Sequence, residues 1–186
     1  MNRDRVSRFS AKTVVVLLLL WAAAPSPARA QDVAAGEAIA TVMAALSITA
    51  VQPLNFGNVY QGVAKSQDEN DDLNSGIFQI LGANSAGISL YIALPAYLAL
   101  PDGSDRLIVA FSITDCTIDT MALSPSTVTP ADGWADVDPH NLPNGLVVGT
   151  GGQTNVYLGG KVIPSVDQEA GNYAGDIIAS VAYNGT

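Results

Sequence analysis

The last sixteen residues of the chain constrain its fold more than any other segment. They form a glycine-led turn followed by a run in which apolar and polar side chains alternate, as in a half-buried strand. The leading glycine and the positions expected on the buried face are Gly171, Tyr173, Ile177, Ala179, Val181 and Tyr183. Because chain ends usually fray, a core strand here predicts a sheet protein whose final strand is structurally required.

The first thirty residues have the pattern of a secretory signal peptide. Basic residues precede an apolar run over residues 14–24, and Ala28-Arg29-Ala30 follows as a small-x-small cleavage site. The apolar run is shorter than the roughly 20 residues that a membrane span needs. We therefore expect a mature chain that begins at Gln31, has no membrane span, and is exported to the periplasm, the cell surface or the extracellular space.

Removal of that segment would leave a strongly acidic chain. Only Lys65, Arg106 and Lys161 remain against sixteen carboxylates, which gives a net charge of −13. Such a surface repels phosphate groups, and this argues against nucleic acid or anionic lipid as a partner.

Composition favours one all-β domain over residues 31–186. Seventeen glycines and ten prolines separate short runs rich in Val, Ile, Thr, Leu and Tyr, and no window keeps the apolar spacing of an amphipathic helix. Strands are predicted at 38–48, 53–59, 76–81, 87–95, 107–113 and 155–163 and from 171 onward, with a weak strand inside the irregular stretch 115–144. An acidic loop is expected at 67–75.

The first predicted strand has a regular apolar alternation. Its members, which would share one side of an extended chain, are Ala38, Ala40, Val42, Ala44, Leu46 and Ile48. The pattern fits either the ordinary first strand of a complete domain or a strand donated to a neighbouring molecule. The short stretch between Gln31 and this segment favours the ordinary first strand.

Four motifs occur in a defined order along the chain. They are Ala-Thr-Val-Met-Ala-Ala-Leu-Ser-Ile-Thr from Ala40, Leu-Asn-Phe-Gly from Leu54, Tyr-Ile-Ala-Leu-Pro from Tyr91, and Gly-Asn-Tyr-Ala-Gly with Val-Ala-Tyr-Asn near the end. In this order they resemble an uncharacterised family of secreted bacterial domains similar to spore-coat protein U and to the subunits of archaic chaperone-usher pili.

The resemblance implies an immunoglobulin-like, pilin-like antiparallel β-sandwich. No cofactor is expected. In such subunits a missing strand is supplied first by a periplasmic chaperone and then by the N-terminal segment of a neighbouring subunit. The chain departs from the family in two respects: Cys116 is its only cysteine, so no intramolecular disulfide can form, and Asn-Gly-Thr extends beyond Tyr183.

Residues that could support catalysis or bind metal lack a recognisable pattern. His140 is the only histidine, and no nucleophile motif accompanies it or the nearby Asp136 and Asp138. Acidic clusters at 68–72 and 132–138 offer oxygen ligands for calcium but do not match a calcium-binding loop. We therefore predict no enzymatic activity and no metal. Cys116 is expected to be a small buried residue, with a reactive or intermolecular thiol as the alternative.

Two functions follow from these patterns. The leading hypothesis is a structural or adhesive surface protein, a pilin-like subunit that assembles with copies of itself or with related subunits by β-strand addition. The alternative is a self-complete secreted binding module that recognises a glycan or an envelope partner through the loops at 115–144, where Trp134 could contact a sugar or anchor the loop in the core.

Overall fold

The computed structural model describes residues 34–121 and 132–185. The expected signal peptide and its cleavage site lie outside the described residues. By its internal contacts the chain divides into two units, residues 1–40 and 41–186, and all strands belong to the second. In the first unit, the described residues 34–40 are exposed and are not in a strand.

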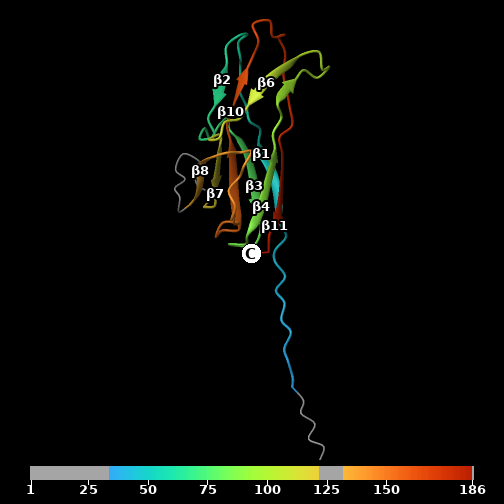
Figure 1. Ribbon diagram of the computed structural model, residues 1–186, viewed down its shortest axis with the longest axis vertical. Helices are drawn as coiled ribbons and strands as arrows, with labels where there is room; N and C mark the ends of the chain where they lie inside the picture. Colours follow the sequence, from blue (N-terminus) through green and yellow to red (C-terminus); the bar gives the residue numbers. More distant parts are fainter. Residues whose placement is uncertain (1–33, 122–131, 186) are drawn as a thin grey trace, which may run out of the picture. The chain divides into compact units, whose positions relative to one another are not determined.

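The second unit is built from strands, and no helix occurs among the described residues (Figure 1). The eleven strands are β1 (Ser47–Gln52), β2 (Lys65–Gln67), β3 (Gly76–Leu81), β4 (Ile88–Ala93), β5 (Tyr97–Ala99), β6 (Arg106–Ala110), β7 (Cys116–Asp119), β8 (Gly133–Val137), β9 (Gln153–Leu158), β10 (Gly160–Ile163) and β11 (Ile178–Tyr183). The predicted all-β class is confirmed.

The strands form three sheets in which every pairing is antiparallel. One sheet has the order β1-β3-β9-β7-β8, the second has the order β2-β10-β6-β5, and the third consists of β11 and β4. In the third sheet the ladder is continuous from Ile178 opposite Ala93 to Tyr183 opposite Ile88. The last strand is thus paired with a strand about 90 positions earlier in the chain.

The first and larger core lies between the five-stranded sheet and the β4–β11 pair. Ile80, Ile118 and Val156 from the first sheet are almost fully buried against Ile88 and Ile92 of β4. Each such side chain contributes roughly 1.5–3 kcal/mol on transfer from water, so this contact is a main source of stability. The molecule is an antiparallel β-sandwich at this end.

A second core lies on the four-stranded sheet. Leu107, Val109 and Val162 are buried there together with Phe56, and Leu54, Leu98 and Tyr173 pack around them. The predicted strand at 53–59 is wrong, because this segment lies outside the ladders although it supplies Phe56. Pro53 has no amide hydrogen to donate to a ladder, and Gly57 adopts a left-handed φ of 59°, which ends an extended run.

The predicted strand at 155–163 is divided between two sheets. β9 belongs to the five-stranded sheet and β10 to the four-stranded sheet, and Gly159 separates them. A Cβ at Gly159 would lie 2.6 Å from the carbonyl oxygen of Gln67, so only glycine lets the chain pass this close to its neighbour. Sequence periodicity did not indicate this change of sheet.

The first predicted strand begins later than expected. Of its six apolar positions only Ile48 lies in β1, and Ala38 to Leu46 are not in a strand. The prediction of an ordinary first strand over 38–48 is therefore wrong for most of the segment. The ladder between β1 and β3 ends where Ser47 pairs with Leu81, the last residue of β3, so the residues before Ser47 find no partner in that strand.

The final strand also begins later than expected. Gly171, Tyr173 and Ile177 lie outside β11, which begins at Ile178, and Tyr173 packs on the second core instead of the first. The hydroxyl of Tyr173 donates to the Asp105 carboxylate at 2.6 Å, which holds this segment beside the four-stranded sheet. The remaining positions from Ile177 to Tyr183 do pack on the first core, as predicted.

Candidate functional site

The β11 strand forms an open edge of the sandwich. It pairs with β4 on one side, and among the described residues no strand pairs with it on the other. β1 runs close to β11, but the two belong to different sheets. An unpaired edge presents a row of backbone donors and acceptors that another strand can bind.

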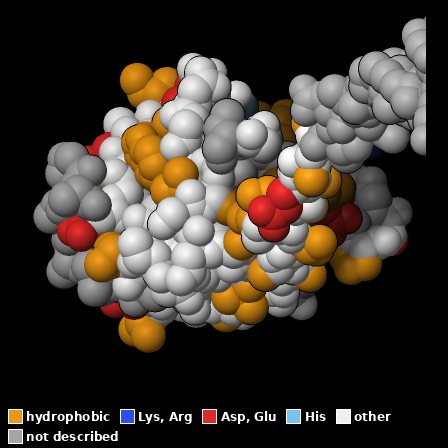
Figure 2. Space-filling view, turned by 90° about the horizontal axis from the view of Figure 1, so that it is seen from below, with side chains coloured by type: hydrophobic (Ala, Val, Ile, Leu, Met, Phe, Trp, Pro, Cys, Tyr) orange, Lys and Arg blue, Asp and Glu red, His pale blue; other side chains and the backbone are white. Residues whose placement is uncertain are grey.

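Apolar side chains along this edge are incompletely covered. Leu46 and Ile48 on one side and Ala179 and Val181 on the other are half-buried against the first core. Larger side chains of β1, β4 and β11 also reach the solvent, namely Val51, Tyr91 and Ile178. Figure 2 shows hydrophobic side chains in several groups over one face of the molecule, with only scattered acidic groups. The edge therefore combines unpaired backbone with apolar side chains.

The segment before β1 exposes its apolar residues. Val42 is 95% exposed and Met43 is 50% exposed, and Ala40 and Ala44 are exposed as well. Ile39, which is on the other side of the alternation, is 88% exposed. Single exposed apolar side chains are common, and Leu73 and Val166 are 82% and 84% exposed as well, but before β1 three large apolar side chains lie exposed within five consecutive residues.

Tyr183 fixes the point where this segment meets the sandwich. Its hydroxyl donates to the carbonyl oxygen of Ala44 at 2.9 Å and accepts from the backbone N–H of Ala83 at 2.7 Å. The tyrosine near the end of the chain is therefore a structural anchor, and Ala44 is held although it is not in a strand.

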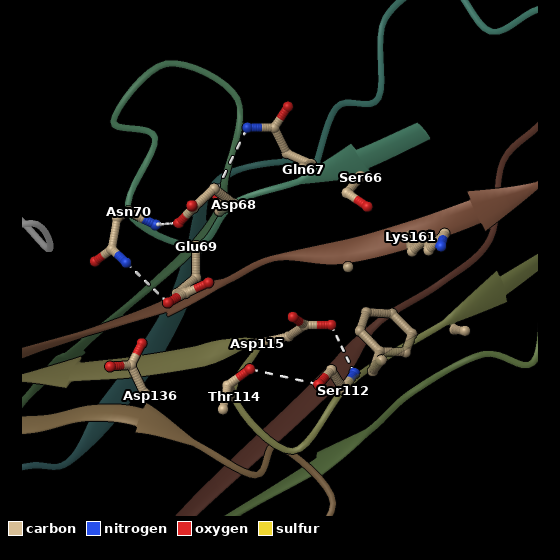
Figure 3. A pocket seen from close by; sticks show the side chains of 13 residues that line it. Ser66, Gln67, Asp68, Glu69, Asn70, Ser112, Thr114, Asp115, Asp136 and Lys161 are labelled. Atoms are coloured by element: carbon tan, nitrogen blue, oxygen red, sulfur yellow. Dashed lines mark hydrogen bonds between the residues drawn. The ribbon is translucent and has the colours of Figure 1, made fainter. Parts of the chain in front are cut away.

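An acidic pocket lies elsewhere, where β2, β6 and β10 meet the loop after β2 (Figure 3). Its volume is about 550 Å³, and its lining includes Asp68, Glu69, Asp115 and Asp136 with a single basic residue, Lys161. Figure 3 shows Asp68 and Glu69 on the loop after β2, with Asp115 and Asp136 on two other segments around the hollow. Asp136 has a left-handed φ of 52°, which is uncommon for a residue with a side chain.

Glu69 is the buried member of this group, with 6% of its surface exposed. Burial is the main cause that raises the pKa of Glu69 to about 7, a backbone hydrogen bond opposes it, and the neighbouring Asp68 and Asp136 carboxyls add to the rise. The amide of Asn70 donates to Glu69 at 2.8 Å. Glu69 is thus a proton-binding group near neutral pH.

The acidic clusters do not form a metal site in the part of the chain that the structure describes. No three histidine, cysteine, aspartate or glutamate side chains there converge at a suitable spacing. The carboxylate of Asp71 instead accepts hydrogen bonds from Gln67, Asn74 and the Leu73 backbone, which order the loop.

Three other residues were singled out in the sequence, namely Cys116, His140 and Trp134. Cys116 is fully buried in the first core, and burial raises the pKa of its thiol, so the alternative of a reactive thiol is not supported. His140 is exposed and lies 3.2 Å from the Asp138 carboxylate. Trp134 packs on the first core, which agrees with an anchoring role.

No protein-family model and no curated protein sequence matches this chain. None of the described residues form a helix that could cross a membrane.

Proposed function

We propose that this protein is a structural or adhesive subunit that assembles by β-strand addition. The segment from Ala38 to Leu46 of one copy would pair with the open edge of β11 in another copy. The observation that carries the proposal is the exposure of Val42, an aliphatic side chain that alternates in register with Leu46 and Ile48 but has no cover in its own chain.

The two surfaces are chemically complementary. The donor offers small and medium apolar side chains on one side of an extended segment, and the acceptor edge offers half-buried Ala179 and Val181 beside unpaired backbone. Addition of a strand would satisfy backbone groups on both and cover apolar surface on both. The resemblance to archaic pilus subunits supports the same mode, and it suggests an immunoglobulin-like topology, export and a periplasmic chaperone as an intermediate partner.

The size of the chain from Gln31 to Thr186 in solution tests this proposal. We expect concentration-dependent oligomers by size-exclusion chromatography with light scattering. Val42→Asp should abolish them, because it places a charge on the apolar side of the donor. Thr41→Asp is the matched control: the same charge sits one residue away on the opposite side and should leave assembly intact.

A peptide experiment separates donor from acceptor. The Val42→Asp protein still has an acceptor edge, so a synthetic peptide of residues 36–48 should bind it and raise its unfolding temperature, whereas the same peptide carrying Val42→Asp should not. A wild-type chain that stays monomeric at every concentration and a peptide that leaves the unfolding temperature unchanged would together contradict the proposal.

A further inference from the structure

A second hollow lies between residues 53–61 and residues 168–175. It has a volume of about 760 Å³ and shares no lining residue with the acidic pocket. Its floor is formed by Leu54, Phe56 and Leu107 of the second core. We call this hollow the Tyr60 groove, after the exposed tyrosine on its rim.

Hydrogen bonds hold the walls of the groove in place. One oxygen of the Asp105 carboxylate accepts from the Tyr173 hydroxyl at 2.6 Å and from the backbone N–H of Glu169 at 2.8 Å, and the side chain of Gln168 donates to it as well. Ala174 is fixed to Ala99 by backbone hydrogen bonds in both directions, at 2.8 and 2.9 Å. A site with pre-formed walls loses little entropy on binding a ligand.

Several polar groups on the rim are available to a ligand. The side-chain amides of Asn58 and Asn172 make no hydrogen bond to any residue that the structure describes, and Tyr60 is 75% exposed. Each amide can donate and accept, and the tyrosine presents a flat apolar ring with a hydroxyl at its tip. The rim thus combines a stacking surface with bifunctional hydrogen-bonding groups.

The charge of the groove restricts the class of ligand. Glu169 is the only charged residue that lines it, and the lining has no lysine, arginine or histidine. Lys65 approaches the same loop but donates to the backbone carbonyl of Asn58 at 3.2 Å. Without a basic group in the lining, phosphate, sulfate and carboxylate ligands are disfavoured.

We propose that the Tyr60 groove binds an uncharged saccharide. The apolar face of a sugar ring would stack on Tyr60, and its hydroxyls would exchange hydrogen bonds with the amides of Asn58 and Asn172. Hydroxyls both donate and accept, as these amides do. An extended peptide would instead need an unpaired strand edge, and β5, the edge strand that lines the groove, already exchanges backbone hydrogen bonds with Ala174 through Ala99. This site is separate from the β11 edge and from the loops at 115–144.

Titration with defined neutral oligosaccharides tests the inference. Maltotetraose, cellotetraose and diacetylchitobiose are added to the full mature chain, with sialyllactose as the anionic comparison, and binding is followed by saturation-transfer NMR and calorimetry. We expect at least one neutral probe to bind and sialyllactose not to bind. Tyr60→Ala and Asn172→Ala should each weaken that binding by about tenfold.

Tyr91→Ala is the matched control, because Tyr91 is also an exposed tyrosine, at 67%, but lies on β4 outside the groove. Thermal unfolding of each variant verifies that it is folded. Failure of all three neutral probes to bind at millimolar concentration would overturn the inference, as would binding that Tyr60→Ala and Asn172→Ala leave unchanged. Binding of an extended peptide in place of every saccharide would also overturn it. The oligomeric state of the Val42→Asp protein is independent of all these outcomes.

Discussion

The hydroxyl of Tyr183 donates a hydrogen bond to the backbone carbonyl of Ala44 at 2.9 Å, across 139 positions of the sequence. The same oxygen accepts from the backbone N–H of Ala83 in the turn between β3 and β4. One side chain thereby joins the last strand, the entry to β1 and a turn. It also marks where the sandwich begins, since Val42 and Met43, just before Ala44, expose their side chains to solvent.

Tyr183→Phe removes the two hydrogen bonds of the hydroxyl without changing the shape of the ring. We expect a loss of about 1–2 kcal/mol in the free energy of unfolding, because two backbone groups lose their partner. Urea denaturation measures the change. Tyr91→Phe is the control, since Tyr91 is 67% exposed and should change stability by little. Equal effects of the two substitutions would contradict the anchoring role.

Val42 and Leu46 lie on the same side of the proposed donor segment, Ala38 to Leu46, but they differ in how far their own chain buries them. Val42→Asp should leave the free energy of unfolding of the monomer within about 0.5 kcal/mol of wild type, because the side chain is exposed. Leu46→Asp should cost more than about 2 kcal/mol, because Leu46 packs on the first core. Urea denaturation at low protein concentration compares them. A large loss for Val42→Asp would show that Val42 is covered within its own chain.

Glu69 should make stability depend on pH. Its pKa of about 7 in the folded chain lies above the ordinary 4.5, so the folded state holds the proton more tightly than the unfolded state. The contribution of Glu69 to the free energy of unfolding is fully present below pH 4.5 and is lost as the pH rises through 7. We expect the free energy of unfolding to fall by about 1–3 kcal/mol over this interval from Glu69.

Glu69→Gln keeps the shape of the side chain and removes the titration. The variant should therefore lose less stability than wild type between pH 5 and pH 8, as followed by urea denaturation at several pH values. Asp102→Asn serves as the control, because Asp102 lies on an exposed turn in which its carboxylate accepts from Ser104. An unchanged pH profile in Glu69→Gln would contradict the assignment.

Cys116 should behave as a core side chain. Because the thiol is fully buried and its pKa is raised, a thiol reagent should label the native protein only at the rate of unfolding, and it should label the protein rapidly in urea. Cys116→Ser should cost about 1–3 kcal/mol by placing a hydroxyl in the apolar core, and Cys116→Ala should cost less. Rapid labelling of the native protein would contradict this assignment.

Local sequence determined the class of the fold and several of its strands. The strand at 76–81 was predicted correctly. So was the face from Ile177 to Tyr183, because a period of two places alternate side chains on one face whatever the partner strand is. Glycine and proline marked most of the turns for a similar reason, since their backbone preferences are local.

The tertiary structure alone decided which strands pair and which apolar segment is left uncovered. The alternation at 38–48 looks the same in a core strand and in an exposed donor, and only the packing of the rest of the chain shows that Val42 has no cover. The Tyr60 groove likewise combines residues 53–61 with residues 168–175, more than 100 positions apart. The apolar periodicity of a segment indicates which of its side chains share a face, whereas edges and grooves arise from how distant segments come together.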